Sequence, residues 1–322
     1  MADSSIPDKH FFQICVIVED LERYAENYRT VLGFDVPREI QTTHDHAHTQ
    51  ATYHGKPMNA RAKIVSFMMG TVAFELLQPL EADSVWMDHL KKYGPSLHHV
   101  AFNVPRIAPA AAFFADHGYR VTQQGLFTGR TGMYAYLDTD KDLGVTIELL
   151  EHYQGGSHPV GPVFPVDKGI GTDRMIQVGL VTNDIAAMTQ RYRDVLGLPE
   201  PSQQETPGYQ ITEATFKGNP TESTAKLAFF NFGQAQLELI EPDQIPSVWR
   251  NDLNVRGDSA HHIAMQVQDT QNAVDHFAKH GIAVAQQGYY GDRSGMYTYI
   301  DSQASLGIVI ELLETFDQVH PV

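Results

Sequence analysis

The sequence predicts an α+β protein built from four copies of one β-α-β-β-β unit. Long segments of the first half return in the second half in the same order. SLHHVAF at 96–102 returns as SAHHIAM at 259–265, and LGVTIELLE at 143–151 returns as LGIVIELLE at 306–314. Repetition at a nearly constant offset is typical of a duplicated structural unit. Each half divides again, because a strand-like run followed by a helical pattern occurs twice within it.

The first unit illustrates the pattern. An apolar run at 11–18 predicts a strand, and Asp20 then stands where the cap of a helix is expected. Gly33 stands where that helix would end. Short β-type runs follow, such as TVAFELLQP at 71–79. Between the cap and the glycine, apolar side chains recur at the helical spacing of three and four: Leu21, Tyr24, Tyr28, Val31 and Leu32.

Two units make up each predicted domain. We expect a first domain at residues 10–152 and a second at 174–316, joined by a linker at 153–173. The linker is rich in Gly and Pro and shows no sustained helical or strand pattern. The residues leave open whether units 1 and 2 pair, with 3 and 4, or whether 1 pairs with 4 and 2 with 3.

Charge and composition exclude several classes of partner. The 322 residues include 23 Lys and Arg against 39 Asp and Glu, which gives a net charge of −16. An acidic chain repels phosphate backbones and anionic lipids, so neither nucleic acid nor membrane is an expected partner. The single cysteine, Cys15, excludes an internal disulfide and fits a reducing compartment. Because no run of about 18 apolar residues occurs either, we expect a cytoplasmic protein.

The order of the four units, with HHVAF and IELLE in alternate ones, resembles the vicinal oxygen chelate superfamily. The similarity is to its glyoxalase I and methylmalonyl-CoA epimerase branch, and it covers nearly the whole chain outside the N-terminal tail and the linker. It implies the glyoxalase/bleomycin resistance/dioxygenase fold, in which the units pair into two curled mixed sheets around a cavity. In that family a divalent metal sits inside the cavity, on ligands from the first and last strands of each unit.

The resemblance implies four metal ligands in each half. Buried carboxylates need a partner, and equivalent ones in four strands need a common partner, which a cation supplies. One imidazole, two carboxylates and one amide oxygen suit Zn, Ni, Co, Mn or Mg, with Fe as an alternative. The alternative interpretation is that these are polar residues at strand ends facing solvent. The implied ligands are Gln13, Glu75, His99 and Glu148 in the first half, and Gln177, Glu238, His262 and Glu311 in the second.

Three neighbours of these positions need an interpretation of their own. His98 and His261 directly precede the histidine ligands, so strand alternation predicts that they point to the opposite face. Cys15 shares a strand face with Gln13, but its repeat counterpart is Gly179. A required nucleophile would be expected twice, so Cys15 is interpreted as a small packing residue.

Two matched arginines are candidates for substrate binding. Arg130 and Arg293 lie in glycine-containing turns before strands that carry Tyr134 and Tyr297. An arginine there could hold a carboxylate or phosphate by two parallel hydrogen bonds, with the tyrosines orienting the rest of the substrate. The alternative is an arginine that closes a turn at the surface.

The resemblance implies a metal-dependent lyase or isomerase of the glyoxalase type. It would move a proton next to a metal-chelated carbonyl or hydroxyl of a small oxygenated substrate, with Glu148 and Glu311 as the bases. Where glutathione would be bound, the first half has Ile17, Pro79 and Pro95, which do not match the family.

Three other functions remain open. A methylmalonyl-CoA epimerase-like enzyme uses the same fold, an extradiol-type dioxygenase needs two histidines and one carboxylate around iron, and a resistance protein binds a small molecule without metal. In each case the partner is a small molecule. Because the chain already contains four units, both a monomeric pseudo-dimer and a homodimer are consistent with it.

Overall fold

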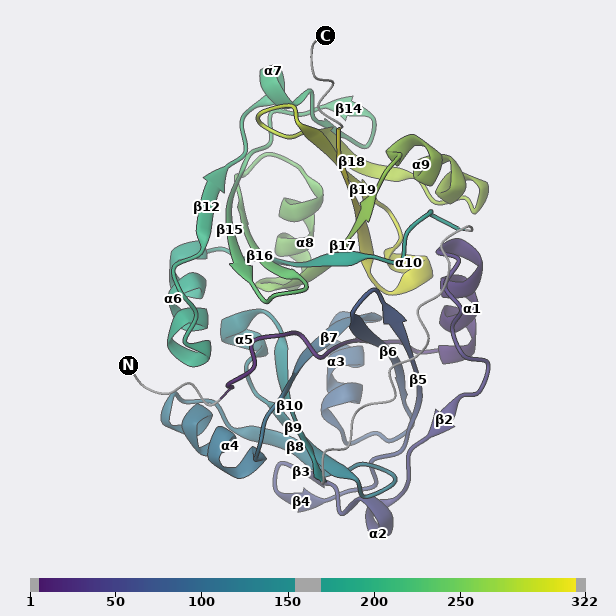
Figure 1. The fold of residues 1–322 in the computed structure, drawn as a ribbon, viewed down its shortest axis with the longest axis vertical. Helices are drawn as coiled ribbons and strands as arrows, with labels where there is room; N and C mark the ends of the chain where they lie inside the picture. Colours follow the sequence, from purple (N-terminus) through teal and green to yellow (C-terminus); the bar gives the residue numbers. More distant parts are fainter. Residues whose placement is uncertain (1–5, 154–168, 317–322) are drawn as a thin grey trace.

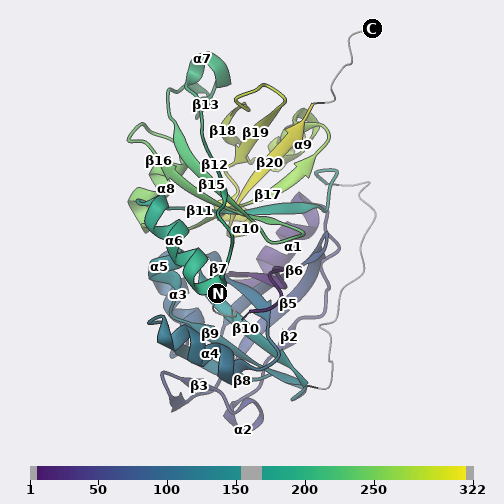
Figure 2. The ribbon, with the colours of Figure 1, turned by 60° about the vertical axis from the view of Figure 1, so that its left-hand side comes forward.

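Two curled ten-stranded sheets form the computed structural model, one from each half of the chain (Figures 1 and 2). The structure describes residues 6–153 and 169–316, called here the N-terminal and C-terminal halves. The predicted α+β class and the two curled mixed sheets are confirmed. Most of the predicted linker, residues 154–168, lies outside the described residues. Within the described part, no helix is long and apolar enough to cross a membrane.

The elements of the N-terminal half follow the predicted order of strand, helix and three or more strands, twice. They are β1 (Gln13–Ile17), α1 (Leu21–Val31), β2 (Gln41–Thr42), α2 (His46–Thr49), β3 (Thr52–Tyr53), β4 (Lys56–Pro57), β5 (Ala62–Met69), β6 (Val72–Pro79), α3 (Val85–Tyr93), β7 (Ser96–Asn103), α4 (Ile107–Asp116), β8 (Val121–Leu126), β9 (Gly132–Leu137), α5 (Asp140–Leu143) and β10 (Thr146–His152).

The C-terminal half repeats the same elements. They are β11 (Met175–Val181), α6 (Ile185–Leu196), β12 (Ser202–Glu205), α7 (Tyr209–Thr212), β13 (Thr215–Phe216), β14 (Asn219–Pro220), β15 (Ala225–Asn231), β16 (Gln236–Pro242), α8 (Val248–Arg256), β17 (Ser259–Val267), α9 (Thr270–Lys279), β18 (Val284–Tyr289), β19 (Gly295–Ile300), α10 (Gln303–Leu306) and β20 (Val309–Thr315).

The strand order shows how the units pair. The N-terminal sheet runs β2-β5-β6-β1-β7-β10-β9-β8-β3-β4, and the C-terminal sheet runs β12-β15-β16-β11-β17-β20-β19-β18-β13-β14. The first strands of units 1 and 2, β1 and β7, pair antiparallel, as β11 and β17 do in units 3 and 4. Unit 1 therefore shares a sheet with unit 2, and unit 3 with unit 4. Figure 1 shows α3 and α8 inside the curve of their sheets.

The helix that follows each first strand begins and ends as the sequence predicts. The Asp20 side chain caps α1 by accepting a hydrogen bond from the Arg23 backbone N–H, and Asp184 caps α6 in the same way. Gly33 follows α1 with φ +79°, a left-handed conformation that glycine adopts without a steric cost. These caps fix the point at which the chain leaves the strand that carries the candidate ligands.

The largest apolar core cluster contains residues of both halves. The hydroxyl of Tyr28 in α1 donates a hydrogen bond to the backbone carbonyl of Leu306, 2.9 Å away in the other half. Its repeat counterpart Tyr192 donates to the carbonyl of Leu143 at 2.7 Å. The contacts are reciprocal, as expected when a duplicated unit packs about a pseudo-twofold axis. The halves are therefore joined by matched, buried contacts rather than by the linker alone.

Candidate metal centres

Four neighbouring strands, β16, β11, β17 and β20, bring the C-terminal candidate ligands together. Gly179 of β11 lies opposite both Glu238 of β16 and His262 of β17. The Nε2 atom of His262 is 3.0 Å from a carboxylate oxygen of Glu311 and 3.4 Å from one of Glu238. Gln177, two residues before Gly179 on β11, is also buried. Three of the four implied ligands of this half, Glu238, His262 and Glu311, therefore converge on one buried point.

The atoms at this point suit a cation. The ligand atoms of Glu238, His262 and Glu311 all lie within 4.8 Å of one another. Nε2 of His262 and the Oε2 atoms of both carboxylates are buried, and apart from their contacts with one another they have no hydrogen-bond partner among the described residues. Buried polar atoms are rarely left unsatisfied, because burying them without a partner costs about 1–3 kcal/mol each. A divalent ion would satisfy all three atoms at once.

Without a metal ion, a proton on His262 neutralises part of the negative charge of the two glutamates. Burial alone would lower the pKa of His262, but Glu311 and Glu238 outweigh it and raise that pKa to about 9. Burial also raises the pKa of Glu238, as does the negative charge of Glu311. The site therefore holds an excess of negative charge that either protons or a metal ion can neutralise.

A β-bulge sets the orientation of the histidine. Between Gly179 and Leu180 the pairing of β11 with β17 shifts from His262 to Ala260, which leaves His261 as the extra residue. The Nδ1 atoms of His261 and His262 are consequently 3.0 Å apart. Burial lowers the pKa of His261 well below its usual range, so its neutral ring can accept a hydrogen bond from the Nδ1–H of His262. That bond leaves Nε2 of His262 free to bind a metal.

The N-terminal half has the same bulge. His98 is the extra residue of β7, and its Nδ1 lies 2.8 Å from that of His99. The expectation that His98 and His261 point to the opposite strand face is therefore wrong. Strand alternation holds only in a regular ladder, and the bulge removes it at this residue.

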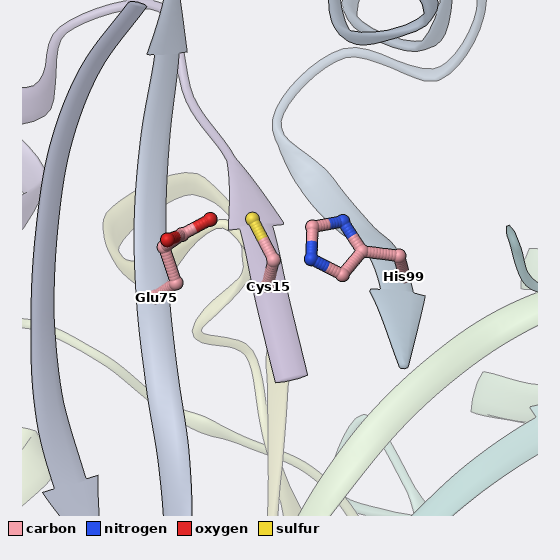
Figure 3. Close-up of side chains that lie close together, drawn as sticks. All are labelled: Cys15, Glu75 and His99. Carbon is pink, nitrogen blue, oxygen red and sulfur yellow. The ribbon is translucent and has the colours of Figure 1, made fainter. Parts of the chain in front are cut away.

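The N-terminal ligand group has a cysteine at its centre. Cys15 of β1 lies opposite both Glu75 of β6 and His99 of β7, and its Sγ points between their side chains (Figure 3). The ligand atoms of these three residues lie within 4.8 Å of one another. His99 Nε2 is 3.1 Å from a carboxylate oxygen of Glu148. Gln13 is buried nearby and helps to stabilise the ionised form of Glu75. Cys15 is fully buried within an apolar cluster, as expected of a packing residue, and its position beside Glu75 and His99 is an additional finding of the structure.

Burial dominates the electrostatics of this group. It raises the pKa of Glu75 to about 7, with a further upward effect from the charge of Glu148 and a downward one from His99. Burial and the two glutamates also raise the pKa of the Cys15 thiol well above its usual range. In the absence of a metal the thiol is therefore neutral.

A cavity of about 540 Å³ opens onto the C-terminal group. Its lining combines aromatic and acidic side chains with the candidate ligands, and no lysine or arginine of the described residues belongs to it. Candidate ligands Gln177, Glu238 and Glu311 all line it. The aromatic side chains of the lining are Phe229, Trp249, Tyr289, Tyr290, Tyr297 and Tyr299.

The predicted substrate residues divide into two groups. Tyr297 lines the cavity, and its counterpart Tyr134 is buried in the N-terminal half. Arg130 donates hydrogen bonds to the backbone carbonyls of residues 47 and 48, at 3.0 and 3.1 Å. Arg293 pairs with Glu213 at 2.8 Å and is not part of the cavity lining. Both guanidinium groups are thus engaged with the loops around α2 and α7.

Solved structures similar to this chain share its whole length. A mutant of 4-hydroxymandelate synthase from Streptomyces coelicolor is 14% identical, with a TM-score of 0.60 over 96% of this chain and 93% of that one. The 2,3-dioxygenase LapB from Pseudomonas sp. KL28 is 15% identical, with a TM-score of 0.53 over 100% and 98%. At these identities the similarity shows the fold.

Sequence comparison identifies the family. The uncharacterized protein YqjC of Bacillus subtilis (strain 168) is 29% identical over 92 residues, which is 28% of this chain and 66% of that protein. The sequence model of one family matches this chain twice, at residues 12–137 and 176–299, once in each half. The chain therefore belongs to the Glyoxalase/Bleomycin resistance protein/Dioxygenase superfamily.

Proposed function

We propose that the C-terminal half carries the active site of a divalent-metal-dependent lyase or isomerase. The observation that supports this most directly is the convergence of Glu238, His262 and Glu311 at a cavity large enough for a small molecule. Gln177, which lines the same cavity, would complete the ligand set. A bound ion would act as a Lewis acid that polarises a carbonyl or hydroxyl of the substrate.

The proposed base is Glu311. Its carboxylate lines the cavity and lies 3.0 Å from His262 Nε2, so it is at once beside the ion site and in reach of a bound molecule. It would take a proton from the carbon next to the polarised oxygen and return it to a neighbouring atom of the substrate. His261 would hold the imidazole of His262 in the tautomer that presents Nε2.

The cavity lining narrows the class of substrate. Its volume of about 540 Å³ lies within the range of roughly 300–1,000 Å³ that is usual for small-molecule sites. Many of the lining side chains are aromatic, and Glu205 and Asp292 add negative charge to the lining. Phosphate groups would meet repulsion there, which disfavours acyl-CoA thioesters and with them the epimerase alternative. We propose a flat, uncharged substrate with two neighbouring oxygen atoms.

A dioxygenase is the second candidate function. The similar full-length structures include a 2,3-dioxygenase and a mutant of 4-hydroxymandelate synthase, and this similarity supports testing the dioxygenase hypothesis. Non-haem iron oxygenases use two histidines and one carboxylate on one face of the metal. The C-terminal group offers one histidine, His262, with two carboxylates, so we rank this function below proton transfer.

The experiment that tests the proposal is solvent exchange. Metal-loaded protein would be incubated in D2O with uncharged aromatic α-hydroxyketones and related α-oxygenated compounds. Deuterium should appear at the carbon beside the carbonyl of a true substrate, as measured by NMR and mass spectrometry. Oxygen consumption with ring cleavage or hydroxylation, and without exchange, would support the dioxygenase instead.

Matched glutamate variants locate the reaction. Glu311→Gln should reduce exchange by at least about 10²-fold, because general-base catalysis contributes roughly 10²–10⁴-fold. Glu148→Gln makes the same change at the equivalent position of the N-terminal half, and it should leave most of the exchange in place. Equal losses in the two variants would contradict the assignment of the active site to the C-terminal half.

A further inference from the structure

We propose that the N-terminal half binds a metal ion through the sulfur of Cys15, together with His99 and Glu75, and that the two halves therefore hold chemically different metals. In the C-terminal half the position equivalent to Cys15 is Gly179, which supplies no ligand atom. The proposal concerns a thiolate ligand that the proposed enzymatic reaction does not require.

The geometry around Cys15 supports three-point binding. The Sγ of Cys15, an imidazole nitrogen of His99 and a carboxylate oxygen of Glu75 come from three adjacent strands, and all lie within 4.8 Å of one another. Figure 3 shows the sulfur between the carboxylate and the imidazole. Ligand atoms about 2.0–2.3 Å from one tetrahedral zinc ion are roughly 3.3–3.8 Å apart. Small side-chain rotations would therefore close the group around an ion.

A second observation points independently to a ligand at this place. His99 is fully buried, and apart from the Glu148 carboxylate oxygen 3.1 Å away its Nε2 atom has no partner among the described residues. Among the described residues, the basic side chain within 4.0 Å of the Glu148 carboxylate is His99. No described lysine or arginine lies within 4.0 Å of the Glu75 carboxylate. Two buried carboxylates and a buried imidazole nitrogen around one thiol form a group whose charge a cation would balance.

The donor chemistry decides which ion fits. Sulfur, nitrogen and carboxylate oxygen are all ligand atoms that zinc accepts, and Glu148 or Gln13 could supply a fourth and so close a four-coordinate site. On binding, the Sγ–metal bond replaces the S–H bond and the thiol proton passes to solvent. The C-terminal set has no sulfur and so favours harder ions with open positions. The N-terminal ion would stabilise the fold, and the C-terminal ion would serve the reaction.

Cobalt substitution tests the proposal without any assay of activity. Co²⁺ would be titrated into the metal-free full-length protein and followed by absorption spectroscopy, because a thiolate bound to Co²⁺ gives a near-ultraviolet charge-transfer band that nitrogen and oxygen ligands do not. We expect this band to saturate at about one Co²⁺ per chain. Cys15→Ser should abolish the band and lower the zinc content by about one ion per chain.

A variant of the other site provides the matched control. Glu238→Gln impairs the C-terminal group and should leave the thiolate band unchanged, so failure of the enzymatic proposal and failure of this one are distinguishable. Zinc X-ray absorption of the unmodified protein should show one sulfur neighbour at about 2.3 Å. That measurement decides the question even if Cys15→Ser does not fold. No thiolate band at saturating Co²⁺, or only nitrogen and oxygen around zinc, would mean that the thiol merely fills the site, and would overturn the proposal.

Discussion

The two halves differ at the centre of their ligand groups by one side chain. Cys15 and Gly179 each lie opposite a glutamate and a histidine, in the same register and next to the same bulge. In the C-terminal half a Cβ atom added to Gly179 would lie 1.9 Å from Cε1 of His262, so the imidazole occupies the space that a side chain would fill. In the N-terminal half the sulfur of Cys15 takes that space.

The consequence of this difference is seen at the histidine. His262 Nε2 reaches the carboxylates of both Glu238 and Glu311, at 3.4 and 3.0 Å. Among the described residues, His99 comes within 4.0 Å of Glu148 alone. A glycine thus allows the imidazole to lie directly between two carboxylates, whereas a cysteine inserts a sulfur atom between the imidazole and Glu75. A duplicated fold can therefore build two different sites from nearly the same ligands.

The largest expected effect comes from filling the space above Gly179. Gly179→Ala should displace the ring of His262 and weaken metal binding at the C-terminal site by roughly 10–100-fold, the size of effect seen when the support of a metal ligand is lost. Overpacking should also lower the free energy of unfolding by about 1–3 kcal/mol. Isothermal titration with Mn²⁺ and urea unfolding of the metal-free protein would measure the two effects.

Alanine at the equivalent N-terminal position is the matched control. Cys15→Ala places the same residue where a Cβ already fits, so it should leave the Mn²⁺ affinity of the C-terminal site unchanged. A Gly179→Ala variant that binds Mn²⁺ as tightly as Cys15→Ala does would show that the close approach of His262 to the backbone is not needed for the site.

The second prediction separates the two halves by pH. In the metal-free folded protein the pKa of His262 is about 9, above its unfolded value of about 6.5. Its contribution to stability is therefore complete below about pH 6.5 and is lost as the pH rises through 9. The pKa of Glu75 is also raised, to about 7. The free energy of unfolding therefore also falls as the pH rises from roughly 4.5 to 7. Each fall should be on the order of 1–3 kcal/mol.

Urea unfolding of the metal-free protein between pH 4.5 and 9.5 would show both falls. Glu75→Gln should reduce the fall at lower pH, to which Glu238 also contributes, and His262→Gln should reduce the fall at higher pH, to which Cys15 also contributes, since neither glutamine titrates. Saturating zinc should suppress both, because the metal replaces the bound protons. A pH dependence that is the same in both variants as in the unmodified protein would contradict this assignment.

Much of the fold could be predicted because the β-α-β-β-β pattern occurs four times along the chain. Apolar periodicity and matching segments indicated the units, and the cap at Asp20 and the stop at Gly33 lie where local rules put them. Pairing of the units could not be predicted, since it depends on contacts between distant strands. The predicted ligand positions meet in space because equivalent strand positions fall on the same face of a sheet.

What the sequence could not show depends on strand register. A β-bulge at His98 and His261 has no signature in an apolar run, so alternation gave the wrong face. The position of Cys15 beside Glu75 and His99 could not be predicted, because a comparison between repeats gives no information on an unmatched residue. Only the pairing of three strands shows that this residue and Gly179 occupy the centre of their sites.

The smallest expected effect concerns the two arginines. Arg130 and Arg293 both have left-handed backbones, with φ of +54° and +58°. The Arg130 side chain donates hydrogen bonds to the backbone carbonyls of residues 47 and 48. The Arg293 side chain donates one to the carbonyl of Ile211. Such contacts fix a loop, so replacing either arginine with alanine should lower the free energy of unfolding by about 0.5–1.5 kcal/mol. Arg293→Ala should leave KM for the exchange substrate within about twofold, because exposed contacts outside the cavity contribute little to binding.

Arg130→Ala, in the half without the proposed reaction, is the control that measures the purely structural loss. A KM that rises at least tenfold in Arg293→Ala alone, with unfolding like that of Arg130→Ala, would show that Arg293 holds the substrate after all.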